Sequence, residues 1–167
     1  PIYPSRIPGL TQVKTLFGSE VLMGAPLRGD SALVIGGGAQ GAETADYLGQ
    51  LGYRTAVVEM REDIALDDAE ATRRLLFRRY EEEKVKTYVG AKVTRVYEDG
   101  VDYETDGQVA SLRGFDNIIL SLGVRSYNPL EEQLKGRVPQ LITVGDAASA
   151  QNAVNAIYTG AVAGTTI

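Results

Sequence analysis

The feature that most constrains this chain is a run of six residues, Gly36–Gly41, that lies between two segments of different hydrophobic pattern. The run reads Gly-Gly-Gly-Ala-Gln-Gly, which is a G-x-G-x-x-G spacing. The apolar residues Ala32–Ile35 come directly before it, as expected of a strand that is buried on both faces of a parallel sheet. Residues 40–51 follow with alanine and leucine at helical spacing, and Gly52 ends this predicted helix. The sequence therefore predicts a glycine-rich turn between a buried strand and a helix.

In a turn of this kind each glycine has its own mechanical role. Gly36 permits the tight turn, Gly38 lets the backbone approach a pyrophosphate, and Gly41 lets the helix pack closely against the strand. Ala39 and Gln40 open the helix, whose N–H groups and positive dipole end would hold the pyrophosphate. We therefore predict a dinucleotide-binding turn. The alternative is a glycine-rich strand–helix turn that binds nothing.

An acidic residue at the end of the next strand supports the first interpretation. Glu59 follows the buried run Thr55–Val58 and lies 23 positions after Gly36. A carboxylate there can accept hydrogen bonds from the ribose hydroxyls of an adenosine. It would repel a ribose 2′-phosphate by about 4 kcal/mol for unit charges 4 Å apart at an effective dielectric near 20, which favours NAD(H) over NADP(H). Arg61 could turn toward a phosphate and leaves NADP(H) open, and a solvated strand-end charge is the other interpretation of Glu59.

The pattern after Glu59 continues the alternation of strand and helix. A charged helix is expected over residues 69–83, with Asp67 and Asp68 as its N-cap candidates. Its buried face would consist of Leu75, Leu76 and Tyr80. Further strands are expected over residues 85–89, 117–121 and 141–144, and a further helix over residues 153–164.

Three short alternating segments interrupt this parallel plan. They cover residues 92–98, 101–105 and 108–113, and the dipeptides Asp99-Gly100 and Asp106-Gly107 join them. Asp-Gly favours a type I′ hairpin turn, because both central residues of that turn need a positive φ. The predicted fold class is therefore α/β: a Rossmann-like, doubly wound parallel sheet with an antiparallel three-stranded meander, as in FAD/NAD(P)-binding folds.

Composition narrows the chemistry that this fold could perform. The absence of His and Cys excludes disulfides, thiolate nucleophiles, Cys/His zinc sites and a histidine base. The chain has 17 Lys and Arg against 22 Asp and Glu, and its net charge of −5 argues against a nucleic-acid or anionic-membrane partner. Chemistry would have to come from a bound cofactor or from carboxylates, and we predict no catalytic side chain and no metal site.

The first residues and the lengths of the apolar runs bear on how the chain is connected and where in the cell it is expected. Residues 1–30 are punctuated by Pro and Gly and are expected to form a connecting arm with at most one short helix. No signal peptide is visible, and the longest apolar runs are far shorter than the roughly 20 residues that span a bilayer, so a cytoplasmic setting is the default expectation. The missing initiator Met suggests that the chain was cut from a longer one, and processing or a cloning choice would give the same start.

Four strings together resemble a known family. These strings are Ala32–Glu43, Val57–Met60, Leu120–Arg125 and Thr143–Asp146. They resemble the two-dinucleotide-binding flavoproteins, which are FAD-dependent pyridine nucleotide oxidoreductases. More narrowly, they are similar to the C-terminal part of the NADH:flavin oxidoreductases, which include 2-enoate reductases and bacterial 2,4-dienoyl-CoA reductases.

The resemblance implies a division of the chain and roles for three further residues. Residues 1–27 would connect from an FAD domain, residues 28–124 would form the NAD(H)-binding domain, and residues 125–167 would return to the FAD domain. Asp146 would hydrogen-bond the ribityl chain of FAD, Glu43 would lie near the nicotinamide carboxamide, and Gly123 would mark the point where the chain crosses beneath the cofactor. The residues alone leave the role of Glu43 undecided, because an acidic residue in the first turn of a helix also interacts favourably with the helix dipole.

The chain also departs from this family. The FAD-binding glycine motif, the barrel domain and the cluster cysteines of the family are absent from these residues. We therefore expect a fragment or stand-alone remnant that does not turn over substrate unaided. In the intact enzyme, NADH would transfer hydride from C4 to N5 of FAD, and the flavin would supply the redox chemistry. The substrate stays open among an enoate, a dienoyl-CoA and a methylated amine.

Two other functions fit parts of the sequence. A non-catalytic ADP- or NAD-binding module of an amine-dehydrogenase-like flavoprotein would use Glu59 in the same way. An autonomous short dehydrogenase would oxidise NADH without added flavin. Binding of NADH in preference to ADP would separate the leading hypothesis from the module.

Overall fold

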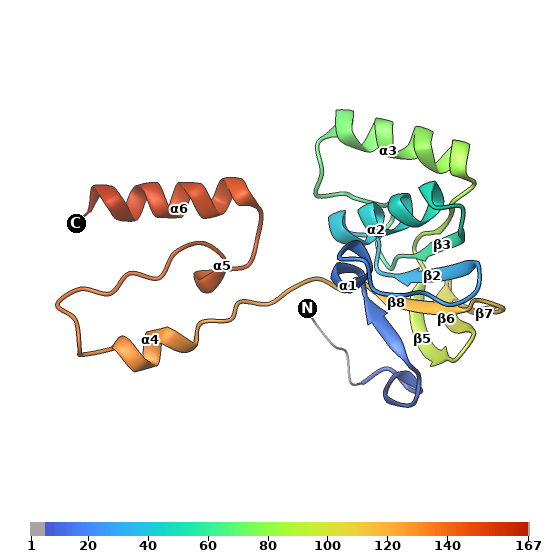
Figure 1. The fold of residues 1–167 in the computed structure, drawn as a ribbon, viewed down its shortest axis with the longest axis horizontal. Coiled ribbons are helices and arrows are strands. Elements are labelled where there is room, and N and C mark those ends of the chain that lie inside the picture. The colour runs from blue at the N-terminus through green and yellow to red at the C-terminus, as the bar shows by residue number, and fades with distance from the viewer. Residues whose placement is uncertain (1–5, 167) are drawn as a thin grey trace. The chain divides into compact units, whose positions relative to one another are not determined.

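The buried apolar runs form the three central strands of a five-stranded parallel sheet, and two less buried strands complete its edges (Figure 1). The computed structural model describes residues 6–166. The chain divides into two compact units, and the boundary in the sequence falls between Gly123 and Val124. The sheet belongs to the first unit. In spatial order its strands are β1 (Thr15–Phe17), β8 (Asn117–Leu120), β2 (Ser31–Ile35), β3 (Arg54–Val58) and β4 (Lys86–Tyr88).

Three helices lie on one face of the sheet. They are α1 (Gly18–Leu22), α2 (Ala39–Gln50) and α3 (Glu70–Glu83). Alternate side chains of the central strands, such as Val34, Val57 and Ile119, pack with Leu48 of α2 and Tyr80 of α3. Because successive side chains of a strand point to opposite faces, the intervening residues of the same strands are buried on the other side.

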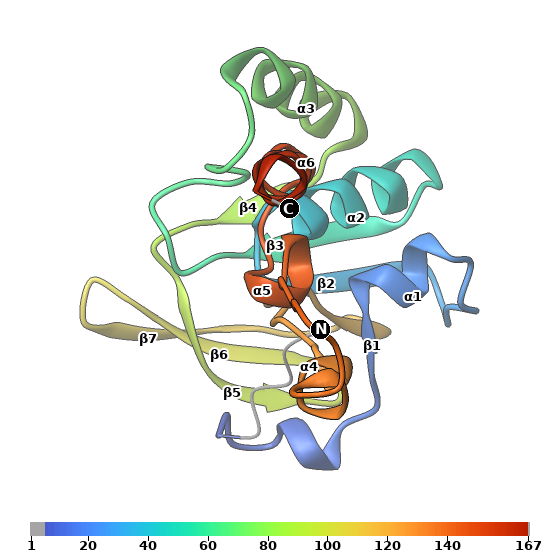
Figure 2. The same cartoon turned by 90° about the vertical axis from the view of Figure 1, so that its left-hand side faces the viewer.

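A small antiparallel sheet covers that other face (Figure 2). It consists of β5 (Lys92–Tyr97), β6 (Gly100–Thr105) and β7 (Gln108–Leu112). Leu33, Ile35 and Leu120 of the parallel sheet pack there against Val96 and Val101. The first unit is therefore a three-layer structure of helices, parallel sheet and antiparallel sheet, and the predicted α/β fold class is confirmed.

The register of the central strands determines where a site can form. Ile35 of β2 pairs with Val58 of β3 on one side and with Leu120 of β8 on the other. The residues that follow these three strands, Gly36, Glu59 and Ser121, consequently leave the sheet at the same edge. In open α/β sheets ligands bind beyond the carboxyl ends of the strands, which is this edge.

The structure corrects two predictions about the ends of the chain. The expected arm contains more than one short helix: it holds the 3₁₀ helix η1 (Leu10–Gln12), strand β1 and helix α1, and β1 extends the sheet by pairing with β8. The predicted strand over residues 141–144 is wrong, because this segment is not a strand. Among residues 6–166 it has no partner strand, and an extended segment becomes a strand only by such pairing.

Three predictions of local detail are also wrong. The N-cap of helix α3 is Ala69, and neither of the predicted aspartates caps the helix with its side chain. Leu75, expected on the buried face of this helix, is 49% exposed. Tyr97 pairs with Gly100, so the first hairpin turn is Glu98-Asp99; Gly100 lies in β6, where a side chain would clash with the Leu112 carbonyl.

The second Asp-Gly turn has the predicted conformation. Both of its central residues have positive φ, 50° at Asp106 and 73° at Gly107.

The second unit is built from short helices and loops. Its helices are α4 (Pro129–Leu134), α5 (Gly145–Ala148) and α6 (Ala153–Thr165). The Asn128 side chain caps α4, and the Thr159 hydroxyl accepts a hydrogen bond from the Gly145 N–H at 2.9 Å. None of residues 124–166 is buried. Within residues 6–166, no helix combines the length and the apolar character that crossing a membrane requires.

A polar network on the antiparallel sheet centres on Asp102. Its carboxylate accepts hydrogen bonds from the Ser111 hydroxyl at 2.6 Å, the Tyr97 hydroxyl at 2.7 Å and the Arg113 guanidinium at 2.7 Å. These bonds, from Ser111 first, lower the pKa of Asp102 to about 2. Because Asp102 joins residues from all three strands, the network ties the small sheet together.

We predict that Asp102→Asn lowers the stability of the chain at neutral pH and that the difference shrinks in acid. The pKa of Asp102 is lower in the folded than in the unfolded chain, so the carboxylate stabilises the fold fully above its unfolded value near 4. That contribution is lost as the pH falls through about 2. Urea unfolding of both chains at pH 7 and at pH 2–3 measures the effect, with Asp106→Asn in the turn of the same sheet as control. Equal urea midpoints for Asp102→Asn and the unmodified chain at pH 7 would contradict it.

Candidate nucleotide-binding site

A cavity of about 600 Å³ lies at the edge where β2, β3 and β8 end. Six of the predicted site residues lie together in the lining of this cavity. These are Gly36, Gly38, Ala39, Gln40, Glu59 and Gly123. Segments that are far apart in the sequence meet here because the parallel register aligns the carboxyl ends of their strands.

The glycine turn has the geometry that its spacing predicts. Gly36 has a φ of 101°, and a side chain there would clash with the carbonyl of Ser121. A side chain at Gly41 would clash with the carbonyl of Gly36, so Gly41 sets the close approach of α2 to the turn. A Cβ at Gly38, by contrast, would come no closer than 3.8 Å to another residue, a nitrogen of Arg61. The backbone at Gly38 is therefore open on its cavity side.

Helix α2 presents its first turn to the cavity. Gly38 precedes the helix as its N-cap, and the first α-helical hydrogen bond runs from the Ala42 N–H to the Gly38 carbonyl at 2.9 Å. The N–H groups of a first helical turn have no partner inside the helix and carry the positive end of its dipole. Ala39 and Gln40 thus line the cavity at a point suited to an anion.

Glu59 is 6% exposed and holds the turn in place. One carboxylate oxygen accepts the Gly37 N–H at 2.6 Å, and the other accepts the Arg61 N–H at 2.8 Å. Each carboxylate oxygen has two lone pairs, so the side chain can accept further hydrogen bonds from a ligand. The buried charge therefore orders the loop and remains an acceptor at the cavity wall.

The guanidinium of Arg61 lies between two acidic side chains. It donates to both carboxylate oxygens of Asp67, at 3.2 and 3.1 Å, and its Nε lies 3.6 Å from Glu59. The hydrogen bonding of the guanidinium to the Asp67 carboxylate is the largest cause of the raised pKa of Arg61. Arg61 and Asp67 both line the cavity.

Apolar side chains form much of the remaining wall. Met60, Val93 and Leu122 line the cavity, and Met60 is 67% exposed. An apolar wall beside an anion site suits a ligand that combines flat rings with phosphates.

Three predicted site residues lie outside this lining. Gly41 lies behind the turn, where it packs against Gly36. Glu43 is exposed on α2 and is not among the described residues that line the cavity. Asp146 belongs to the second unit, where it lies in the first turn of α5 and accepts the Gln151 N–H at 3.4 Å. The roles assigned to Glu43 and Asp146 stay predictions.

Sequence reasoning missed several residues that shape the site, of which Asp67 and Ser121 line the cavity and Gly37 lies in the turn behind it. Gly37 is an unspecified position of the motif, yet a Cβ there would lie 3.0 Å from the Glu59 Cβ. Asp67 is predicted from the sequence as a helix cap, and its pairing with Arg61 depends on the path of the intervening loop. Ser121 lines the cavity and is 7% exposed, and its hydroxyl has no hydrogen-bond partner among the described residues. Only its position after a buried strand could have indicated it.

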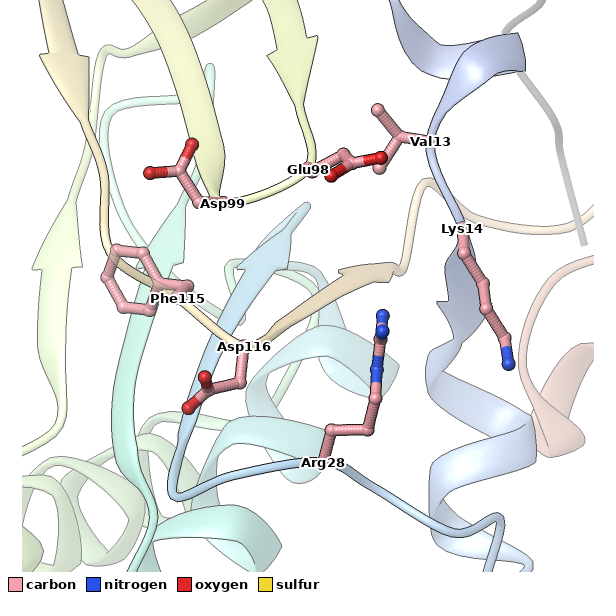
Figure 3. Close-up of a pocket in the computed structure, with 7 residues that line it drawn as sticks. All are labelled: Val13, Lys14, Arg28, Glu98, Asp99, Phe115 and Asp116. Atoms are coloured by element: carbon pink, nitrogen blue, oxygen red, sulfur yellow. The ribbon is translucent and has the colours of Figure 1, made fainter.

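A second cavity, of about 340 Å³, lies at the opposite edge of the sheet (Figure 3). Asp116 in its lining precedes β8, and its carboxylate accepts the N–H of Asp30 at 3.0 Å and the hydroxyl of Ser31 at 2.6 Å. This edge carries the amino ends of the strands, and the carboxylate is already engaged by the loop before β2. The first cavity is therefore the better candidate for a ligand.

Comparison with known proteins establishes the family. The family model described as pyridine nucleotide-disulphide oxidoreductase matches residues 1–160. The chain therefore belongs to this family of oxidoreductases, and the predicted relationship is confirmed. The family and its flavin-dependent neighbours bind FAD and NAD(P)H.

Two curated relatives are much longer than this chain. Bilirubin reductase of Mediterraneibacter gnavus is 35% identical over 127 residues, which are 76% of this chain and 20% of that protein. Cinnamate reductase of Clostridium sporogenes is 27% identical over 148 residues, which are 87% of this chain and 22% of that protein. The chain thus spans about a fifth of the length of these relatives.

Solved structures share the fold. A 2-naphthoyl-CoA reductase has a TM-score of 0.88 at 23% identity, and the match covers 100% of this chain and 25% of that one. A 6-hydroxypseudooxynicotine amine oxidase from Pseudomonas geniculata has a TM-score of 0.86 at 22% identity, with 97% and 26% covered.

A matched pair of glycine substitutions separates binding from folding at the turn. Gly38→Ala should lower the free energy of unfolding by no more than about 1 kcal/mol: its Cβ meets no clash and its φ of −66° suits alanine, and the remaining cost is the preference for glycine over alanine at an N-cap. It should weaken NADH binding by tenfold or more, about 1.4 kcal/mol, because the methyl group would occupy the space predicted for the pyrophosphate. Gly41→Ala should instead destabilise the fold by about 1–3 kcal/mol, because its Cβ clashes with a backbone carbonyl.

Urea unfolding and calorimetric titration with NADH measure the two effects. A Gly38→Ala chain that folds normally and binds NADH as tightly as the unmodified chain would contradict the proposed path of the pyrophosphate.

Proposed function

We propose that this chain binds NAD(H) in the cavity at the carboxyl ends of β2, β3 and β8. We further propose that in an intact flavoprotein the bound NADH donates hydride to FAD. The observation that carries the proposal is a convergence: the glycine turn, the first turn of α2 and the acidic Glu59 line one cavity. A dinucleotide is the ligand whose diphosphate and ribose match this combination.

The pyrophosphate would lie against the backbone of Gly38 and the first turn of α2. Gly38 leaves room on its cavity side, and the helix supplies N–H donors and a positive dipole end. The loop needs little rearrangement, because Glu59 already fixes the Gly37 N–H at 2.6 Å.

The adenosine ribose would lie beside Glu59. Its 2′- and 3′-hydroxyls can donate to the carboxylate oxygens, which keep lone pairs after accepting the Gly37 and Arg61 N–H groups. A 2′-phosphate at the same place would face a buried negative charge. This arrangement supports NADH as the preferred nucleotide.

The hydride acceptor would be a flavin held largely by parts of a longer chain. The relatives are named as reductases, and one further relative is an NADH oxidase. Flavin supplies the two-electron chemistry when bound, and this chain supplies the position of the nucleotide. No acid or base from this chain would be required for this step, because a hydride moves together with its two electrons and the transfer involves no separate proton.

The ends of the chain would belong to the flavin domain. We propose that residues 1–27 connect from it, that residues 28–124 form the nucleotide-binding domain and that residues 125–167 return to it, with Asp146 near the ribityl chain. The second unit supports this division, because it exposes Val154, Ile157 and Tyr158 by 66–74% and buries none of residues 124–166. A unit with no buried core of its own needs another surface to cover its apolar side chains.

Calorimetric titration of the 167-residue chain with NADH, NADPH and ADP tests the proposal. We expect NADH to bind at least tenfold more tightly than NADPH, a difference of about 1.4 kcal/mol, because of the charge of Glu59. We also expect NADH to bind more tightly than ADP. The Gly38→Ala chain is the matched control for binding at the turn.

Three outcomes would contradict parts of the proposal. Equal affinity for ADP and NADH would favour a nucleotide-holding module without hydride donation. Preference for NADPH would overturn the role of Glu59. Oxidation of NADH by the purified chain without added flavin would instead show an autonomous dehydrogenase.

A further inference from the structure

The segment between β3 and α3 forms the outer wall of the nucleotide cavity. It carries Met60, Arg61 and Asp67, all of which line the cavity. Its course is fixed from within: Ile64 is 0% exposed, and the Ala65 N–H donates to the Gly37 carbonyl at 2.7 Å. Residues on this segment therefore keep a defined position relative to the glycine turn.

Further hydrogen bonds fix the two ends of the segment. The Arg61 carbonyl accepts the Gly90 N–H at 2.7 Å, and the Asp68 N–H donates to the Ala65 carbonyl at 3.0 Å. The backbones of Arg61 and of the residue after Asp67 are thus anchored independently of the contact between the two side chains. That contact can be removed without releasing the wall.

The Arg61 side chain has each of its three guanidinium nitrogens within 4 Å of a carboxylate. Two nitrogens bind Asp67 as a fork, at 3.1 and 3.2 Å, and the third lies 3.6 Å from Glu59. One of them lies only 3.8 Å from the place that a Gly38 Cβ would occupy. The guanidinium of Arg61 therefore lies close both to the glycine turn and to Glu59, the acid that would hold the ribose.

Arginine beside a strand-end acid has the chemistry to bind a ribose 2′-phosphate, because its planar fork matches phosphate oxygens in pairs. In this chain the same fork is already used by Asp67. The side chain of Asp67 is 70% exposed and that of Arg61 is 35% exposed. If Arg61 left Asp67 for another anion, little charge would therefore be buried or exposed. A phosphate that competes for Arg61 must displace Asp67 and also approach its negative charge.

We propose that Asp67 determines nucleotide specificity by holding Arg61 away from a 2′-phosphate. The inference rests on the proposed binding of NADH in this cavity. It adds a second barrier to NADP(H): Glu59 repels the 2′-phosphate directly, and Asp67 withholds the cation that would neutralise it. Removing Asp67 frees Arg61 while Glu59 still holds the turn and the ribose hydroxyls.

The test compares the affinities of NADH and NADPH in Asp67→Ala, Asp67→Asn and the unmodified chain. We expect the ratio of NADPH to NADH affinity to rise about tenfold in Asp67→Ala and to rise less in Asp67→Asn, since the amide oxygen can still accept one bond from Arg61. Any effect of the freed Arg61 on the shared pyrophosphate changes both affinities alike and cancels in this ratio, so the ratio reports on the 2′-phosphate alone. Asp68→Asn is the matched control, because it removes the same charge from the neighbouring residue, which does not line the cavity.

A double substitution assigns the effect to Arg61. In Arg61→Ala/Asp67→Ala the gain in NADPH affinity should disappear, while the backbone N–H of residue 61 can still donate to Glu59. An unchanged ratio in Asp67→Ala, an equal rise in Asp68→Asn, or a gain that survives loss of the Arg61 side chain would overturn the inference. Failure of the unmodified chain to bind NADH would overturn the proposed function, so the two failures are distinguishable.

Discussion

The hydrogen bonds of the Glu59 carboxylate are the interaction on which the site depends. Glu59 is almost fully buried, and a buried charge is tolerated only where hydrogen bonds replace its water. The N–H groups of Gly37 and Arg61 supply them. The same bonds fix the glycine turn against the end of β3. One side chain therefore orders the loop before any ligand binds, which lowers the entropy that binding would otherwise lose.

The three layers explain why this edge of the sheet is available. The helices and the small antiparallel sheet cover the two faces of the parallel sheet and leave the carboxyl ends of β2, β3 and β8 uncovered. Strand β8 follows the antiparallel sheet in sequence but enters between β1 and β2, and so brings Ser121 and Gly123 beside Gly36. The antiparallel sheet also contributes Lys92 and Val93 to the cavity wall. An insertion that interrupts the parallel order in sequence thus completes the site in space.

The sequence is sufficient wherever the physical cause is local. The glycine turn, helix α2 and the Asp106-Gly107 hairpin were predictable because φ preferences and helical spacing act within a few residues. The place of β1 beside β8 was not, since it depends on pairing between residues about a hundred positions apart. Asp67 shows the same limit: an aspartate ahead of a helix favours an N-cap, but the loop turns its side chain toward Arg61. The segment 141–144 has the composition of a strand, but none of the residues that the structure describes pairs with it.

The most direct test of the central claim is to locate the bound nucleotide on the backbone. A ¹H–¹⁵N NMR titration of the 167-residue chain with NADH reports on each amide separately. The account predicts that the largest shifts fall on the amides of residues 37–41, followed by those of Glu59 and Arg61. Shifts that instead gather around Lys14, Arg28 and Asp116 would place the ligand at the opposite edge of the sheet and contradict the account.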